Sequence, residues 1–184
     1  YKGNPLQPLF PGGKWAPVNL APNTYFRRGR LLGEVNNSAN DVQTGTVTGG
    51  PTGGLVRVAF AHPMSGALGT FDLLYNSSAA QAQTAIRALV GQTAYTISGG
   101  AWPPTPLVFT AAGPFVGMPI LLMAVQSNLL TGGTNPAGTF AKTTHGRSKG
   151  TFAPYTPGAA DGSEVARGIL QYEAATDSAG NITF

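Results

Sequence analysis

The two histidines are the side chains best suited to bind a metal ion or to exchange a proton near neutral pH. His62 lies in AFAHPMSG and His145 lies in TTHGRS, and neither has a carboxylate at the spacing of a metal-ligand motif. The chain contains no cysteine, which excludes thiolate metal sites and disulfide bonds. We therefore interpret each histidine as a surface or loop residue, and no metal or other cofactor is predicted.

The serines and acidic residues give little support for catalysis. A Ser–His–Asp site stays open from the sequence, because its members meet only in space. No G-x-S-x-G motif is present, and GSE at 162–164 and MSG at 64–66 are typical of turns. PGGKW at 11–15 lacks the spacing of a phosphate-binding loop. The sequence therefore does not predict an enzyme.

Charged residues are few and unevenly placed. They make up 10% of the 184 residues, so the surface is either covered with uncharged polar residues and backbone or hidden by partners. We take this as a first indication of an assembly component. Residues 1–35 carry five basic residues against Glu34, whereas residues 150–184 carry four acidic residues against Arg167. FRRGR at 26–30 could contact nucleic acid or face an acidic protein surface. The protein surface is favoured, and no direct nucleic-acid partner is predicted.

The region between Arg87 and Lys142 has no charged side chain, so its composition differs from that of both flanks. Its most apolar part, Pro106–Val125, has the length of a membrane span. Pro114 and Pro119 would break a lipid-exposed helix. This part is therefore expected to form two short buried strands joined by a turn. No membrane partner is predicted.

Residues 1–24 are expected to form an extended N-terminal arm. Five prolines remove backbone donors from this segment, so neither a helix nor a central strand is expected. A solitary arm cannot bury its own apolar side chains, which include Leu6, Leu9, Phe10, Trp15 and Val18. Two interpretations stay open: these side chains dock on another protein, or they pack on the body of the same chain.

The rest of the sequence predicts short strands and one helix. Strands are expected within 25–35, at 42–48, 55–60 and 70–75, and again at 94–98, 107–111 and 120–125. The helix begins after Ser77 or Ser78 and ends at Gly91, and its apolar residues recur at helical spacing. Residues 131–149 are expected to form a loop that can include a short strand. Trp102, in AWPPTP, is either a packed loop anchor or a glycan platform, and the anchor is favoured.

The stretch GTFAPYTPGAADGSEVARGILQYEAATDSAG, residues 150–180, resembles the phage head decoration proteins related to the lambda capsid-stabilising protein. The resemblance also covers RRGRLLGEV at 27–35, a strand that in the family runs by a short turn into the strand that corresponds to GTFAPY. The residues that intervene here are similar to a small domain seen in phage structural proteins. The residues that carry the main resemblance are Tyr155, Pro157, Ala159, Ala160, Asp161, Gly162, Val165, Ala166, Gly168, Ile169 and Leu170.

The resemblance implies a mainly β fold in three parts. These are the arm at 1–24, a small β-barrel-like decoration core formed by 25–35 with 148–184, and an inserted α+β domain with one helix at 36–147. Loops tolerate such insertions because the entropy of closing them grows slowly with length. The residues expected in the trimer-forming core are Tyr155, Asp161, Gly162, Val165, Ile169 and Leu170.

The function implied is that of a structural protein on the exterior of the virion. Such a protein binds the major capsid protein of the expanded head as a homotrimer and stabilises the head against the pressure of its DNA. The competing expectation is a surface or tail-associated adhesion module, in which the inserted domain contacts host-surface glycans. The expected capsid-binding residues are Lys2, Leu6, Leu9, Phe10, Trp15, Arg27, Arg28 and Arg30.

Overall fold

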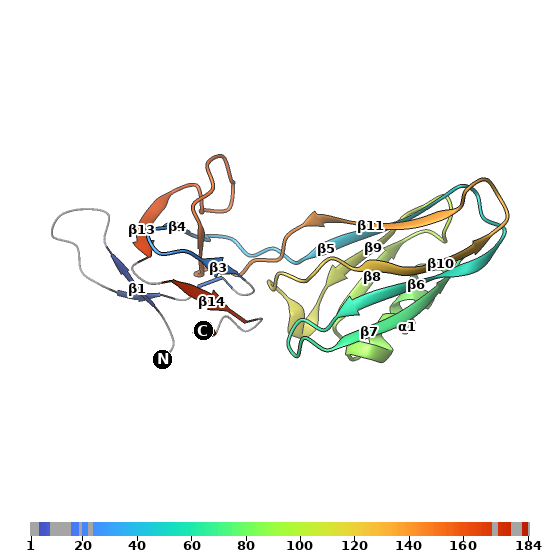
Figure 1. Cartoon of the computed structure of the whole chain (residues 1–184), viewed down its shortest axis with the longest axis horizontal. Helices are drawn as coiled ribbons and strands as arrows, with labels where there is room; N and C mark the ends of the chain where they lie inside the picture. Colours follow the sequence, from blue (N-terminus) through green and yellow to red (C-terminus); the bar gives the residue numbers. More distant parts are fainter. Residues whose placement is uncertain are drawn as a thin grey trace. The chain divides into compact units, whose positions relative to one another are not determined.

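The computed structural model describes residues 4–7, 16–18, 20–21, 24–170, 173–177 and 182–183 (Figure 1). These residues form a mainly β fold with one α-helix, which confirms the expected fold class. The chain divides into two compact units. Unit 1 comprises residues 1–39, 117–119 and 147–184, and unit 2 comprises residues 40–116 and 120–146. From the sequence, the arm was placed at 1–24, the discontinuous core at 25–35 with 148–184, and the inserted domain at 36–147.

Unit 1 contains two small sheets. The larger sheet has five strands in the order β12-β4-β13-β1-β2, and the smaller has three in the order β15-β14-β3. Within the described residues neither sheet closes on itself, so a barrel-like core is not confirmed. The strands are β1 (Asn4–Gln7), β2 (Ala16–Val18), β3 (Tyr25–Phe26), β4 (Leu31–Glu34), β12 (Phe152–Pro154), β13 (Ala166–Leu170), β14 (Ala174–Thr176) and β15 (Ile182–Thr183).

Part of the N-terminal segment pairs within its own unit. The backbone of β1 pairs with β13, Leu6 opposite Leu170, and with β2, Pro5 opposite Pro17. The expectation that this segment contains no central strand was therefore wrong for residues 4–7. Every second pair of an antiparallel ladder exchanges no hydrogen bonds, so two prolines can face each other there without leaving a donor unpaired.

The core of unit 1 joins its two sheets. Phe26 of β3, Leu32 of β4 and Leu170 of β13 are fully buried, and Leu20 and Ala174 complete the cluster. β12 pairs with β4, Phe152 opposite Glu34, although residues 35–151 separate the two strands in sequence. The two ends of the stretch 35–151 are also hydrogen-bonded to each other. The Val35 amide donates to the Thr151 carbonyl at 2.9 Å, and the Gly150 amide donates to the Val35 carbonyl at 2.8 Å.

Unit 2 consists of two antiparallel sheets. One has three strands in the order β10-β6-β7, and the other has four in the order β11-β5-β9-β8. Alternate residues of β5 are buried, as the pattern VQTGTVT predicts for a strand with one face on a core. The elements are β5 (Val42–Thr48), β6 (Gly53–Ala61), β7 (Leu68–Leu74), α1 (Ala79–Val90), β8 (Tyr95–Gly99), β9 (Leu107–Ala111), a 3-10 turn (Gly113–Phe115), β10 (Ala124–Thr131) and β11 (Ala137–Thr144).

Aromatic rings fill the space between the two sheets of unit 2. Phe71 of β7 lies 6.3 Å from Phe109 of β9, and Phe60 of β6 lies 6.0 Å from Tyr95 of β8, measured between ring centroids. Trp102 is 1% exposed, and its indole N–H donates to the Gly45 carbonyl at 3.1 Å. The packed-anchor interpretation of Trp102 is therefore confirmed.

Helix α1 follows β7 and begins as the sequence predicts. Ser78 is the N-cap: its hydroxyl accepts the Gln81 amide, and the Gln81 side chain accepts the Ser78 amide, so two helix-end donors are satisfied. Ala82 and Ile86 form the buried face of the helix. The helix ends before Gly91, whose positive φ of 99° suits a residue without a side chain.

No helix of the described residues is long and apolar enough to cross a membrane.

Two boundary predictions in unit 2 were wrong. Residues 120–123 are not in a strand, and β10 begins only at Ala124. The stretch 137–144, expected in a loop that can include a short strand, is the longer, eight-residue strand β11, paired with β5 from Ala137 opposite Thr48 onward. The reason is tertiary: buried polar side chains of unit 2 bind the backbone of 120–123, whereas β5 offers a full ladder to β11.

Candidate interaction surface

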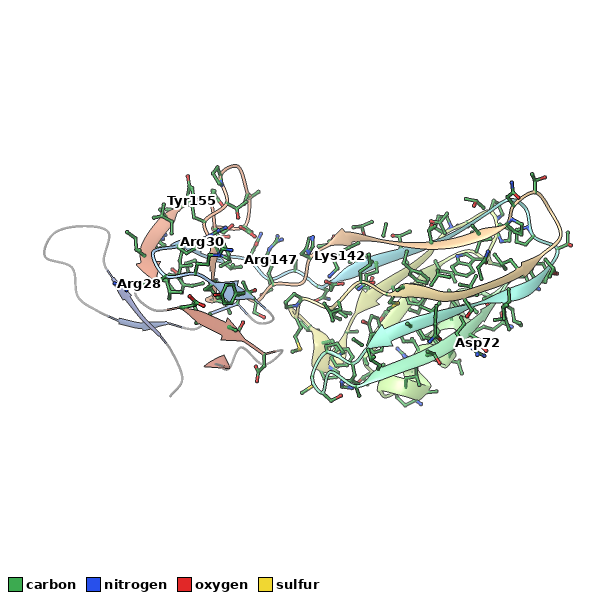
Figure 2. The ribbon with its side chains drawn as sticks, viewed as in Figure 1. Arg28, Arg30, Asp72, Lys142, Arg147 and Tyr155 are labelled. Atoms are coloured by element: carbon green, nitrogen blue, oxygen red, sulfur yellow. The ribbon has the colours of Figure 1, made fainter. Side chains whose placement is uncertain are left out.

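The arginines of the predicted capsid-binding set lie together in the turn between β3 and β4. Arg27, Arg28 and Arg30 are all exposed, and Figure 2 labels Arg28 and Arg30. The Gly29 amide donates to the Leu170 carbonyl at 2.8 Å, and the Leu170 amide donates to the Arg30 carbonyl at 2.9 Å. Gly29 has a φ of 76°, a left-handed conformation that glycine adopts without steric cost. The turn is thus held against the end of β13.

Buried residues on both sides fix this turn to the core of unit 1. Phe26 precedes the arginines and Leu32 follows them, and both side chains are 0% exposed. Burying two large apolar side chains stabilises the segment that carries the turn by about 3–6 kcal/mol. The turn therefore presents its three guanidinium groups from a rigid base, and less conformational entropy is lost when they bind a partner.

The three guanidinium groups make no ion pair with a carboxylate in the part of the chain that the structure describes. Their exposed neighbours are Tyr25, at 56% of its area, and Leu31, at 37%. The Tyr25 hydroxyl donates to the carboxylate of Glu173, and this hydrogen bond raises the pKa of Tyr25. Positive charge beside exposed aromatic and aliphatic surface is the composition of a protein-binding patch.

The structure does not describe the side chains of the other predicted capsid-binding residues. Lys2, Leu9, Phe10 and Trp15 lie outside the described residues, as does the side chain of Leu6. We call the surface formed by Tyr25, Arg27, Arg28, Arg30 and Leu31 the arginine turn.

The residues expected in a trimer-forming core occupy different environments. Leu170 is fully buried within unit 1, and Ile169 is half-buried. Val165 is 47% exposed. Tyr155 follows β12, and its amide donates to the Leu31 carbonyl at 2.9 Å. Leu170 therefore stabilises its own unit, whereas Val165 is open to a partner.

Asp161 and Gly162 form a tight turn against β4. One carboxylate oxygen of Asp161 accepts the Ser163 amide at 3.0 Å and the Ser163 hydroxyl at 2.6 Å, and the other lies 3.5 Å from the Arg147 Nε. Partial burial opposes ionisation, but these donors together hold the pKa of Asp161 below its usual value. The Asp161 carbonyl accepts the Asn36 amide at 2.6 Å. This turn therefore ties β4 to the segment that begins at Arg147.

A buried polar cluster in unit 2 was not predicted from the sequence. Asp41 is 1% exposed, and one of its carboxylate oxygens accepts the Lys142 ammonium at 2.9 Å and the amides of Ile120 and Gly146 at 3.1 and 3.2 Å. Gln43 donates to the Leu121 carbonyl at 3.0 Å and accepts the Met123 amide at 2.8 Å. The backbone of 120–123 is thus held by side chains instead of a strand. An acid and a lysine so far apart in sequence give no local signal.

The two histidines lie in loops of unit 2. The His62 Nδ1 accepts the amides of Met64 and Ser65, both at 3.3 Å, and the ring contacts Phe115 edge-on with centroids 5.3 Å apart. His145 is exposed after β11. Each histidine is therefore a loop residue, as interpreted from the sequence. His62 caps the turn that joins β6 to β7.

Comparison of the chain with protein-family models, with curated proteins and with solved structures gives no match.

Proposed function

We propose that the chain is a decoration protein that binds the outer surface of an expanded phage head and stabilises it. The observation that carries the proposal is the arginine turn. Three exposed guanidinium groups, without a carboxylate partner in the described residues, lie in a turn between the buried Phe26 and Leu32, within the segment that resembles the decoration family. An acidic, partly apolar surface of the major capsid protein would complement them.

The pairing of β4 with β12 also supports the proposal. These strands correspond to the two that a short turn joins in the decoration family, and they pair here across residues 35–151. A hairpin whose turn has been replaced by an insertion would keep this pairing. Residues 40–116 and 120–146 form the separate compact unit that such an insertion requires.

The N-terminal segment has a smaller part in this proposal than its composition suggests. The strands Asn4–Gln7 and Ala16–Val18 extend the sheet of unit 1, so their backbones already have partners.

Trimer formation on the head remains part of the proposal, with the exposed Val165 as its first candidate contact. Three copies of the arginine turn in one trimer would give avidity from modest individual contacts.

The test measures binding to empty, expanded heads built from the major capsid protein encoded with this chain. The triple variant Arg27→Glu, Arg28→Glu, Arg30→Glu should bind at least about tenfold more weakly, because each reversal replaces attraction by repulsion. Binding of the unmodified protein should also weaken as salt screens the charges. Co-sedimentation with heads gives the occupancy.

Single variants provide a matched control. Arg28→Glu and Lys149→Glu each reverse one exposed positive charge of unit 1. Arg28→Glu should lower the occupancy, and Lys149→Glu should leave it close to that of the unmodified protein. Equal effects of the two, or undiminished binding of the triple variant, would overturn the proposal. Binding to host envelope but not to heads would favour the adhesion module instead.

A further inference from the structure

The two edges of the four-stranded sheet in unit 2 differ in how they are protected. An edge strand presents unpaired backbone groups that can pair with another chain. The order β11-β5-β9-β8 makes β8 one edge and β11 the other. The hydrogen bonds of each edge show which can accept a further strand.

Helix α1 covers the edge at β8. The Gln83 side chain accepts the Ile97 amide at 2.9 Å, and the Arg87 guanidinium donates to the Tyr95 carbonyl from Nε at 2.9 Å and from Nη2 at 2.7 Å. These two backbone groups belong to alternate residues and therefore point to the same side of the strand. Two helix side chains thus take the place of a neighbouring strand.

The register of the sheet shows which groups of β11 face outward. The Ala111 amide donates to the Asp41 carbonyl, so Asp41 and, by alternation, Gln43 and Gly45 direct their backbone groups toward β9. Thr44 and Thr46 then direct theirs toward β11, where they lie opposite Ala141 and Thr139.

The backbone groups of Gly138, Phe140 and Lys142 consequently face the open edge. No further strand pairs with that side of β11 in the described residues. An extended segment of another chain could form a ladder with these three residues.

The usual protections of an edge strand are lacking over most of β11. Residues 137–141, AGTFA, contain no charge and no proline. The Lys142 ammonium is engaged by the buried Asp41, and the irregularity in the ladder falls only between Lys142 and Thr144. The side chains of Thr139 and Ala141 are exposed but too small to cover the backbone of the edge. Charge, proline and bulges, which commonly block such edges, therefore do not block this one.

We propose that β11 is a self-association edge, which pairs antiparallel with β11 of a second copy of this chain. With Phe140 opposite its own counterpart, the two residues exchange both backbone hydrogen bonds, and Thr139 lies opposite Ala141 of the second copy. The strand is complementary to itself in this register, as a two-fold contact requires, and brings no like charges together. The proposal goes beyond capsid binding and does not depend on it.

The experiment compares two charge-bearing variants of the full chain by sedimentation velocity over a range of concentrations. Thr139→Lys with Ala141→Lys places lysines directly opposite each other in the proposed ladder. The concentration for half-association should rise about tenfold. Thr96→Lys with Ser98→Lys adds the same charge to the guarded strand β8 and should leave self-association unchanged. Equal association of both variants would overturn the proposal.

Hydrogen exchange of the unmodified protein gives a second readout that needs no variant. On raising the protein concentration, the amides of Gly138 and Phe140 should gain protection, whereas those of Tyr95 and Ile97 should not change. Association through unit 1 would protect other amides and leave β11 exchanging as before. Absence of concentration-dependent protection in β11 would overturn the proposal, as would a chain that stays monomeric throughout.

Discussion

Gly33 of β4 lies backbone to backbone against Ser163 of the turn at 161–164: a Cβ added to Gly33 would be 2.3 Å from the Ser163 carbonyl oxygen. Ser163 is itself 3% exposed, so it has little room to move. This approach, together with the hydrogen bonds of Asp161, joins the N-terminal segment of unit 1 to its C-terminal segment.

Replacing Gly33 by alanine should destabilise unit 1 by about 1–3 kcal/mol, because the new methyl group overlaps backbone that cannot rotate away. Gly69→Ala in β7 is the matched control, since its added Cβ would make only ordinary contact with Leu89, at 3.4 Å. Chemical denaturation, monitored by amide exchange in β4 of unit 1 and in β7 of unit 2, measures the loss of stability in each variant. An unchanged stability of unit 1 in Gly33→Ala would show that the contact relaxes freely.

Replacing Lys142 by methionine should destabilise unit 2 by about 3–5 kcal/mol, because it leaves the buried carboxylate of Asp41 without its opposite charge. Arg57→Met breaks the other ion pair of unit 2, between Arg57 and Asp72, whose side chains are 45% and 38% exposed. That change should cost less than about 1 kcal/mol. Thermal and denaturant unfolding of both variants gives the comparison. Similar small losses would mean that Asp41 is solvated in solution.

Stability contributed by Asp161 should depend on pH. Because the pKa of Asp161 is below its unfolded value of 3.8, the ionised group stabilises the fold above that pH, and this contribution is lost as the pH falls through the folded pKa. Asp161→Asn should therefore cost about 1 kcal/mol at pH 6 and less near pH 3. Denaturation at both pH values measures the difference. A penalty that is the same at both would contradict an electrostatic role.

Removing the Tyr95 hydroxyl should not harm unit 2. Tyr95 is 1% exposed, and its hydroxyl has no hydrogen-bond partner among the described residues. Burial raises the pKa of Tyr95, and the charge of Asp41 raises it further, so the group stays neutral. Tyr95→Phe should leave the free energy of unfolding unchanged or raise it by up to about 1 kcal/mol. A clear loss of stability would reveal a hydrogen bond to this hydroxyl.

Local pattern alone determined several elements of this protein. Ser78 and Gln81 form the expected helix cap, and Ala82 and Ile86 form the buried face of α1. The alternation in VQTGTVT marks β5, because a strand with one face on a core needs an apolar or small residue at every second position. The arginines at 27–30 were also visible in the sequence. Their exposure followed from charge, since unpaired guanidinium groups are rarely buried.

Tertiary partners decided what local pattern could not. Residues 120–123 are as apolar as many strands, but Asp41 and Gln43 hold their backbone from a distance in sequence. Residues 137–144 form a strand because β5 supplies a ladder, and Asn4–Gln7 joins a sheet despite its proline because β13 and β2 pair with it. Side-chain periodicity is a property of neighbouring residues and can be seen in the sequence. Which distant backbone or carboxylate completes a hydrogen bond depends on how the folded chain brings those groups together.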